Sequence, residues 1–408
     1  MNLFRLAFLN ATRNRTRSLL TAGIIVGGTA LFIISMSWLD GVWDQILEEG
    51  TLQGGHIEVV TQEYRARASL RPQDENINDL APVLDALRSQ EGVVDAQPII
   101  ETGATLTVGE DIGDVFGAVM GAEEKYFTEY MDVDSKIVEG RWLKEGAGEL
   151  VLGWKLAQRT GAKLGDEVIL LGMTQDGSMS PSKGTLVGIA RSGSPLVDRR
   201  VFVDLAAAQW SLDLEGGAMK VLVWGEDRED VDELQASIAA LPPLIGLDTS
   251  SWKTLPPWGG QLGIMAAIRF VLMFMIAFLA GLGVWNTMMM SVLERTNEIG
   301  VLRAMGMTRP GAVFLFLFEG IAIAILGGIG GVVAGVLPTL YMSRHGFSYP
   351  ESMLAKMEVP LPTTLYAQLS SEIVLLAFLT AIFTAVIGTF LPALRAATIQ
   401  PDSAMRRN

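Results

Sequence analysis

Four long stretches of the chain contain no charged side chain, and each is long enough to cross a lipid bilayer as a helix. A membrane helix needs about 20 mostly apolar residues, so an uncharged run of about 18 or more is a candidate span. The four runs are Ser18–Leu39, Phe270–Leu293, Gly320–Ser343 and Ile373–Leu394. The pattern therefore predicts an α-helical membrane protein with four spans.

Between the first and second spans the pattern changes to short segments rich in β-branched residues, separated by helical stretches. Strands are expected at His56–Val60, Thr105–Val108, Val115–Met120, Glu149–Leu152, Glu167–Leu171, Thr185–Ile189, Arg200–Val203 and Val221–Trp224. Helices are expected over Leu80–Arg88, over Leu205–Leu212 and from Asp230 to near Leu241. This alternation predicts a large α+β domain whose strands are too short for a doubly wound sheet.

Together these patterns divide the chain into nine segments. In chain order they are a cytoplasmic amphipathic segment (1–17), the first span (18–39), an extracytoplasmic α+β domain (40–261), the second span with an outer extension (262–293), a cytoplasmic helix and turn (294–310), the third span (311–342), a short outer loop (343–371), the fourth span (372–394) and a cytoplasmic tail (395–408).

Composition and charge support this division. Half of the residues are hydrophobic, only 19% are charged, and the mean hydropathy is +0.35, which is too apolar for an ordinary soluble protein. Residues 40–260 hold 38 of the 45 acidic residues but 18 of the 31 Lys and Arg, so this segment carries a net charge of −20. The remainder is net basic. The long insert is therefore expected to be an acidic, solvent-exposed domain.

The basic residues predict the orientation in the membrane. Arginines cluster before the first span, between the second and third spans, and in the tail: Arg5, Arg13, Arg15, Arg17, Arg295, Arg303, Arg309, Arg395, Arg406 and Arg407. The positive-inside rule then places both termini and the 294–310 loop in the cytoplasm and the large domain on the opposite side of the membrane. A cleaved signal peptide is disfavoured, because the first run exceeds a usual signal core and no A-x-A-like site follows it.

Candidate chemistry is sparse. Cysteine is absent and only His56 and His345 are present, so neither thiol chemistry nor a zinc cluster is expected, and no metal site or catalytic residue is predicted. The chain has no G-x-S-x-G, H-E-x-x-H or phosphate-binding G-x-x-x-x-G-K-[ST] motif. It is therefore not expected to be an enzyme, and any ATPase activity is assigned to a partner. No nucleic-acid partner is expected.

The loop after the second span has the sequence ERTNEIGVLRAMGMTRP, residues 294–310. Glu294 and Glu298 lie one helical turn apart, Ile299 and Leu302 share a neighbouring face, and Gly306 can end a helix. A short amphipathic helix of this kind either docks in the groove of a partner or serves as a polar connector, and the spacing alone favours the connector.

A family resemblance favours docking. The run ERTNEIGVLRAMGMTR at 294–309 and FEGIAIAILGGIGG at 318–331 resemble the signature of FtsX-like permeases, the membrane subunits of MacB/Lol-type (type VII) ABC transporters. The stretch GELVLGWKLAQRTGAKLGDEV at 148–168 resembles the MacB-like periplasmic core domain, and PALRAATIQPDSAMR at 392–406 resembles the closing motif of the family. With no ATPase on the chain, the lipoprotein-releasing permeases are the nearest subgroup.

The resemblance implies a dimer of permeases, with an identical or paralogous second permease, bound to two copies of a cytoplasmic ABC ATPase. ATP and Mg would be bound by that ATPase, and no cofactor is expected on this chain. Segment 294–309 would be the coupling helix, with these ATPase-coupling residues: Glu294, Arg295, Glu298, Gly300, Arg303, Ala304 and Gly306. Closure of the ATPase would push the second helix as a stiff rod and so move the outer domain, a process called mechanotransmission.

Two features inside the predicted spans require contacts with neighbouring groups. Glu319 interrupts the third hydrophobic segment, 311–342, where a charge near the bilayer centre costs on the order of 3 kcal/mol. We expect it to lie near the inner edge, to pair with another group or to be protonated, and a structural contact is favoured over a proton relay. Gly327, Gly328 and Gly331 belong to a glycine-rich stretch whose small-xxx-small spacing predicts close packing with a neighbouring helix.

The resemblance leaves three functional hypotheses. The first is extraction of lipoproteins, or of another amphiphilic cargo, from the inner membrane for delivery to a periplasmic carrier. The second is MacB-like efflux of a toxin, peptide or antibiotic with a periplasmic adaptor. The third is FtsX-like signalling across the membrane to a cell-wall hydrolase.

Overall fold

The computed structural model describes residues 15–68, 72, 74–109, 114–192, 195–214, 216–348 and 364–399. The chain forms two compact units. We call them the membrane unit (Met1–Gln45, Gly263–Ser348 and Thr364–Asn408) and the sheet unit (Ile46–Leu262 and Tyr349–Thr363). Most of the predicted amphipathic segment 1–17 and of the tail 395–408 lies outside the described residues.

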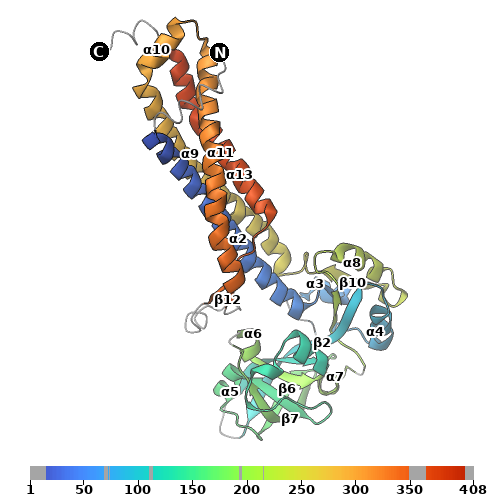
Figure 1. The fold of residues 1–408 in the computed structure, drawn as a ribbon. Helices are drawn as coiled ribbons and strands as arrows, with labels where there is room; N and C mark the ends of the chain where they lie inside the picture. Colours follow the sequence, from blue (N-terminus) through green and yellow to red (C-terminus); the bar gives the residue numbers. More distant parts are fainter. Residues whose placement is uncertain are drawn as a thin grey trace. The chain divides into compact units, whose positions relative to one another are not determined.

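In the part of the chain that the structure describes, five helices provide the framework of the membrane unit (Figure 1). They are α2 (Arg15–Gly54), α9 (Trp258–Glu294), α10 (Thr296–Ala304), α11 (Arg309–His345) and α13 (Ser371–Thr398). Among the described residues, all but the short α10 are long and apolar enough to cross a membrane. The fold class of four spans with a large domain between the first two is thereby confirmed. At 1.5 Å per residue, α9 and α11 with 37 residues each reach about 55 Å, well beyond a hydrocarbon core of about 30 Å.

The glycines of α11 lie where other helices approach closely. A Cβ atom added to Gly331 would lie 2.5 Å from Thr29 Cβ on α2, and one on Gly327 would lie 3.1 Å from Ile25 Cβ. On another side of α11, a Cβ on Gly328 would lie 3.0 Å from the ring of Phe378 on α13. Glycine is needed here for the space it leaves, because any side chain would push the helices apart.

The opposite end of the bundle from α10 carries a short antiparallel pair, β11 (Phe347–Ser348) and β12 (Thr364–Leu365) (Figure 1). The backbone that follows β12 lies against α2. Gln368 N donates to Ser37 O at 2.8 Å, and Gln45 Nε2 donates to Tyr366 O at 3.0 Å. Gly41 permits this contact, since a Cβ there would lie 2.0 Å from Tyr366 O.

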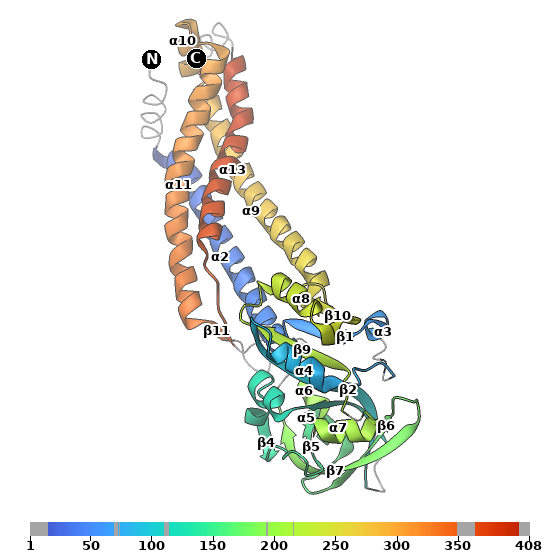
Figure 2. The same ribbon diagram turned by 90° about the vertical axis from the view of Figure 1, so that its right-hand side faces the viewer.

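Within the described residues, the sheet unit contains one sheet of ten strands (Figure 2). They are β1 (Ile57–Thr61), β2 (Val93–Val108), β3 (Val115–Ala122), β4 (Ile137–Gly140), β5 (Glu149–Gly153), β6 (Glu167–Met173), β7 (Met179–Ala190), β8 (Arg200–Asp204), β9 (Lys220–Gly225) and β10 (Leu247–Ser251). The order is β10-β1-β9-β2-β3-β8-β5-β7-β4, and β6 pairs with both β2 and β7.

These pairings close six strands into a ring, β2-β3-β8-β5-β7-β6. Outside the ring, β9, β1 and β10 form an open extension next to β2, and β4 pairs with β7. The 16-residue β2 belongs to both parts. Its first half pairs with β9 in the extension, and its second half pairs with β3 and β6 in the ring. The expectation of uniformly short strands was therefore wrong for β2 and for the 12-residue β7. Both strands are long because each pairs with different neighbours along its length.

Helices cover this sheet. They are α3 (Gln62–Ala66), α4 (Leu80–Arg88), α5 (Trp154–Thr160), α6 (Pro195–Asp198), α7 (Leu205–Leu212) and α8 (Val231–Ala239). α7 lies against five of the six ring strands. It begins directly after β8, where Asp204 Oδ1 accepts a hydrogen bond from Ala207 N at 2.7 Å and so caps the helix.

An aromatic cluster in the core of the sheet unit holds the last turn of α2, which belongs to this unit from Ile46 onward. Trp224 Nε1 donates to Leu52 O at 2.9 Å, and Tyr126 OH donates to Gln53 O at 2.8 Å. Tyr130 stacks on Trp224 with ring centroids 3.9 Å apart. Burial raises the pKa of Tyr126 to about 12, so its hydroxyl keeps the proton that it donates.

Charged side chains alternate across the strands of the sheet unit. Lys220 on β9 lies between Glu58 on β1 and Glu101 on β2, with Nζ–O distances of 3.7 and 2.9 Å. Arg200 on β8 extends the row with an ion pair to Glu101 at 2.9 Å. The two carboxylates raise the pKa of Lys220 above its usual range despite the opposing effect of burial, so this inward-facing lysine stays charged.

Candidate functional site

The helix predicted to couple the chain to a partner is α10, at one end of the bundle (Figures 1 and 2). Its buried face carries Ile299, which packs in the apolar cluster of the membrane unit with Phe316 of α11 and Ala396 of α13. Gly306, with φ of +99°, ends the helix, and Met307 N donates back to Leu302 O at 3.1 Å. α10 is therefore a short, well-capped helix with one face fixed to its own bundle.

Arg295, at the start of α10, makes ion pairs within the chain. Its Nη1 donates to both carboxylate oxygens of Glu319, at 3.1 and 3.3 Å, and its Nε donates to Glu298 Oε2 at 3.1 Å. Its guanidinium lies over the ring of Phe316, 5.9 Å from the centroid. Glu319 is buried, and Arg295 supplies the partner that an acid in this hydrophobic run requires.

Arg303, at the end of α10, binds the end of α13. Its Nη1 donates to Ala397 O at 2.5 Å and to Ile399 O at 2.8 Å. These carbonyls belong to the last turn of α13 and to its C-cap, where backbone oxygens lack helical partners and the helix dipole favours a cation.

The exposed face of α10 is mainly apolar. Asn297, Val301, Ala304 and Met305 face outward, and the side chains of Val301 and Met305 are 46% and 71% exposed. Asn297, Val301 and Met305 follow one another at intervals of four residues, so they form one stripe along the helix. We call these four residues the exposed stripe.

The seven predicted coupling residues are thus divided between two environments. Glu294, Ala304 and Gly306 are exposed. Gly300 is buried, and Arg295 and Arg303 are directed to groups of the same chain, with Glu298 beside Arg295. Sequence reasoning missed Val301 and Met305, although their four-residue spacing after Asn297 was available as a signal.

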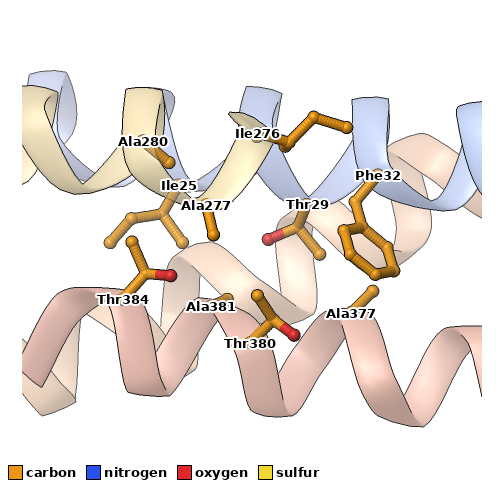
Figure 3. A pocket seen from close by; sticks show the side chains of 11 residues that line it. Ile25, Thr29, Phe32, Ile276, Ala277, Ala280, Ala377, Thr380, Ala381 and Thr384 are labelled. Atoms are coloured by element: carbon orange, nitrogen blue, oxygen red, sulfur yellow. The ribbon is translucent and has the colours of Figure 1, made fainter. Parts of the chain in front are cut away.

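The centre of the membrane unit contains a small cavity between α2, α9 and α13 (Figure 3). Its lining is mostly apolar and small, with hydroxyls from Thr29, Thr380 and Thr384. The free space is about 20 Å³, enough for one water molecule and for no larger solute. The buried Thr29 hydroxyl has no hydrogen-bond partner within the described part of the chain.

The described residues contain no group of three or more His, Asp and Glu side chains placed to hold a metal ion. His56 accepts a hydrogen bond at Nδ1 from Gly225 N at 3.1 Å, and burial lowers its pKa. His345 stacks on Tyr341, one turn earlier in α11. Both histidines therefore have local structural contacts.

Within the described residues, four candidate spans, a large sheet unit inserted in sequence between the first and second, and a short helix between the second and third form the plan of a multispan membrane protein. The model of the MacB-like periplasmic core domain matches residues 18–241, more than half of the chain, and the model of the FtsX-like permease C-terminal region matches residues 270–401. The chain belongs to this family, the ABC-transporter permeases of LolC/MacB type, which confirms the resemblance found in the sequence.

Two relatives illustrate the range of the family. The chain is 24% identical to the lipoprotein-releasing system transmembrane protein LolC of Neisseria meningitidis, over 94% of this chain and 92% of that protein. It is 23% identical to the macrolide export ATP-binding/permease protein MacB of Acinetobacter baylyi, over 99% of this chain and 59% of that protein. The periplasmic region of MacB from Actinobacillus actinomycetemcomitans matches 51% of this chain and 94% of its own, with 16% identity and a TM-score of 0.36. Membership in this class of transporter implies an ATPase partner.

Proposed function

We propose that the chain is a permease subunit that couples ATP hydrolysis by a separate ATPase subunit to movement of the sheet unit, and that its cargo is lipoproteins. The supporting observation is α10, which is capped at its end, anchored on one face and exposed on the other. A helix in this state is preorganised for docking, because little conformational entropy remains to be lost when a partner binds.

The exposed stripe is the proposed docking face for the ATPase. An aspartate at Val301 or Met305 would bring a charge into an apolar contact and would weaken binding, since a buried unpaired charge is costly. We expect Val301→Asp and Met305→Asp to lose the co-purifying ATPase while the chain still enters the membrane. Arg309→Asp is the control, because the first turn of a helix tolerates a carboxylate. Full retention of the ATPase by both stripe variants would refute this docking face.

The proposed orientation puts α10 in the cytoplasm and the sheet unit in the periplasm. Because the chain has no cysteine, single cysteines can be introduced without a background. Trp210 in the sheet unit and Met305 beside α10 are 74% and 71% exposed. A membrane-impermeant maleimide should label Trp210→Cys in spheroplasts and should reach Met305→Cys only after the inner membrane is opened. The reverse pattern would overturn the orientation.

The lipoprotein cargo is supported by the LolC relative, which this chain matches over nearly the full length of both proteins. Depletion of the permease should leave lipoproteins in the inner membrane of spheroplasts supplied with periplasmic extract. Unchanged release of lipoproteins after depletion would refute the proposal that lipoproteins are the cargo. The MacB relative, matched over 99% of this chain, supports efflux as a second candidate. That function predicts antibiotic sensitivity of a deletion strain and recovery of an adaptor with the sheet unit.

A further inference from the structure

The two arginines of the α10 segment lie at its two ends, and each is bonded to a different membrane helix. Arg295 binds Glu319 of α11, and Arg303 binds the carbonyls of Ala397 and Ile399 at the end of α13. Eight residues separate the arginines, which is about 12 Å along a helix. We call these two contacts the α11 latch and the α13 latch.

The α11 latch is strongly held because its acid has been removed from solvent. Glu319 is only 5% exposed, and the side chain of Arg295 is 16% exposed. Both carboxylate oxygens of Glu319 accept from Arg295 Nη1. Removing either partner would leave a buried charge uncompensated, which is much more costly than losing an exposed ion pair. The pair therefore resists separation when α10 is displaced.

The α13 latch uses backbone acceptors. The carbonyls of Ala397 and Ile399 lie where α13 ends and would otherwise lack a donor, so Arg303 completes that end of the helix. Between the two latches, Ile299 packs in a cluster that includes Phe316 of α11 and Ala396 of α13. α10 thus contacts α11 at its start, α13 at its end and both helices through its buried face.

We propose that Arg295, Glu319 and Arg303 are positioning residues that make α10 move together with the ends of α11 and α13, so that a push on α10 is passed directly to the third and fourth spans. This inference rests on the proposed function, since it needs a partner that pushes α10. It assigns to both arginines a role within the chain, different from the ATPase contacts expected from the sequence. In this proposal α11 and α13 transmit the movement together with α9, the helix that precedes α10.

The test uses the full-length chain with its co-purifying ATPase in nanodiscs, and it reads out movement without reference to cargo. Arg344 is exposed near the far end of α11, so Arg344→Cys provides a reporter there in the cysteine-free chain. The measured quantity is the change in its maleimide labelling rate when the ATPase is trapped with ADP and vanadate. The variants Arg295→Gln, Glu319→Gln and Arg303→Gln break the latches, and Arg309→Gln is an exposed arginine control.

We expect each latch variant to retain the ATPase and to reduce the change in labelling rate by about tenfold, within the usual range of coupling between distant sites. The exchange Arg295→Glu with Glu319→Arg should restore most of the change, which separates a specific pair from general damage to the fold. Arg309→Gln should behave as the unmodified chain.

Three results would count against these ideas in distinguishable ways. A full labelling response in the three latch variants would overturn the latch inference. A chain that carries bound ATPase but shows no response at Arg344→Cys would also overturn it, because movement then does not reach α11. Failure of any ATPase to co-purify with the unmodified chain would instead refute the proposed coupling function. If the single variants unfold, the double variant Arg295→Glu with Glu319→Arg is the deciding test. A double variant that folds but does not recover the change in labelling rate would contradict the latch inference.

Discussion

The packing of α11 on α2 gives a prediction that depends only on distances within the membrane unit. A Cβ added at Gly331 would lie 2.5 Å from Thr29 Cβ and 2.9 Å from Val26 O. Two carbons pack best at about 3.5–4.0 Å, so Gly331→Ala must separate the two helices by about 1 Å at this point. The contact at Gly327 on the same face would loosen with it.

Overpacking of this kind costs roughly 1–3 kcal/mol. Gly27→Ala on α2 is the matched control, because a Cβ there has no atom within 4 Å. In purified protein in detergent, we expect the temperature of half-aggregation to fall by several degrees for Gly331→Ala and to stay within error for Gly27→Ala. Thr29→Gly added to Gly331→Ala should recover part of the loss, since the clash with Val26 O remains. Equal stability of the two alanine variants would refute the argument.

Three further predictions concern other contacts. Gly41→Ala should detach the backbone at Tyr366 from α2, which limited proteolysis would detect as faster cleavage, and an unchanged cleavage rate would contradict this close approach. Lys220→Met should destabilise the sheet unit by roughly 1–3 kcal/mol, because it removes the shared cation between Glu58 and Glu101 and leaves each with a single arginine partner, Arg65 and Arg200 respectively; urea unfolding followed by tryptophan fluorescence measures this, and a wild-type midpoint would refute it. His56 has a lowered pKa in the folded chain, so its contribution to stability is present above its ordinary pKa of about 6.5 and is lost as the pH falls through the folded value. The unfolding midpoint of the sheet unit should therefore drop as the pH falls below about 6.5, and His56→Gln should reduce that drop.

The spans could be predicted from the sequence because a lipid-facing segment must satisfy every backbone hydrogen bond internally, which leaves long uncharged helices as a strong signal. The same signal did not give the full length of α2, which continues to Gly54. Its last turn is held by Trp224 and Tyr126, more than 70 residues away in the chain. No local pattern records such partners.

The strands were predicted where β-branched residues alternate and were missed where they do not. The first half of β2 contains Asp95, Gln97 and Pro98, and β10 has the polar sequence LDTSS. These segments are strands because β9 and β1 pair with them and because their polar groups find partners, such as Tyr130 OH and Lys125 Nζ on Asp95. Tertiary contacts here override a weak local preference.

The α10 segment shows the same limit in the candidate site. The family resemblance implied that Arg295 and Arg303 contact the ATPase and gave no role to Val301 and Met305. In the structure, Glu319 accepts from Arg295, and carbonyl oxygens at the end of α13 accept from Arg303. These acceptors lie far from the arginines in the sequence, so no local pattern indicates them. Once the charged groups are used internally, the surface left for a partner is the mainly apolar stripe. We therefore expect charge at this site to hold the helix in position and apolar contact to provide most of the proposed binding, and the stripe and latch variants measure these two contributions separately.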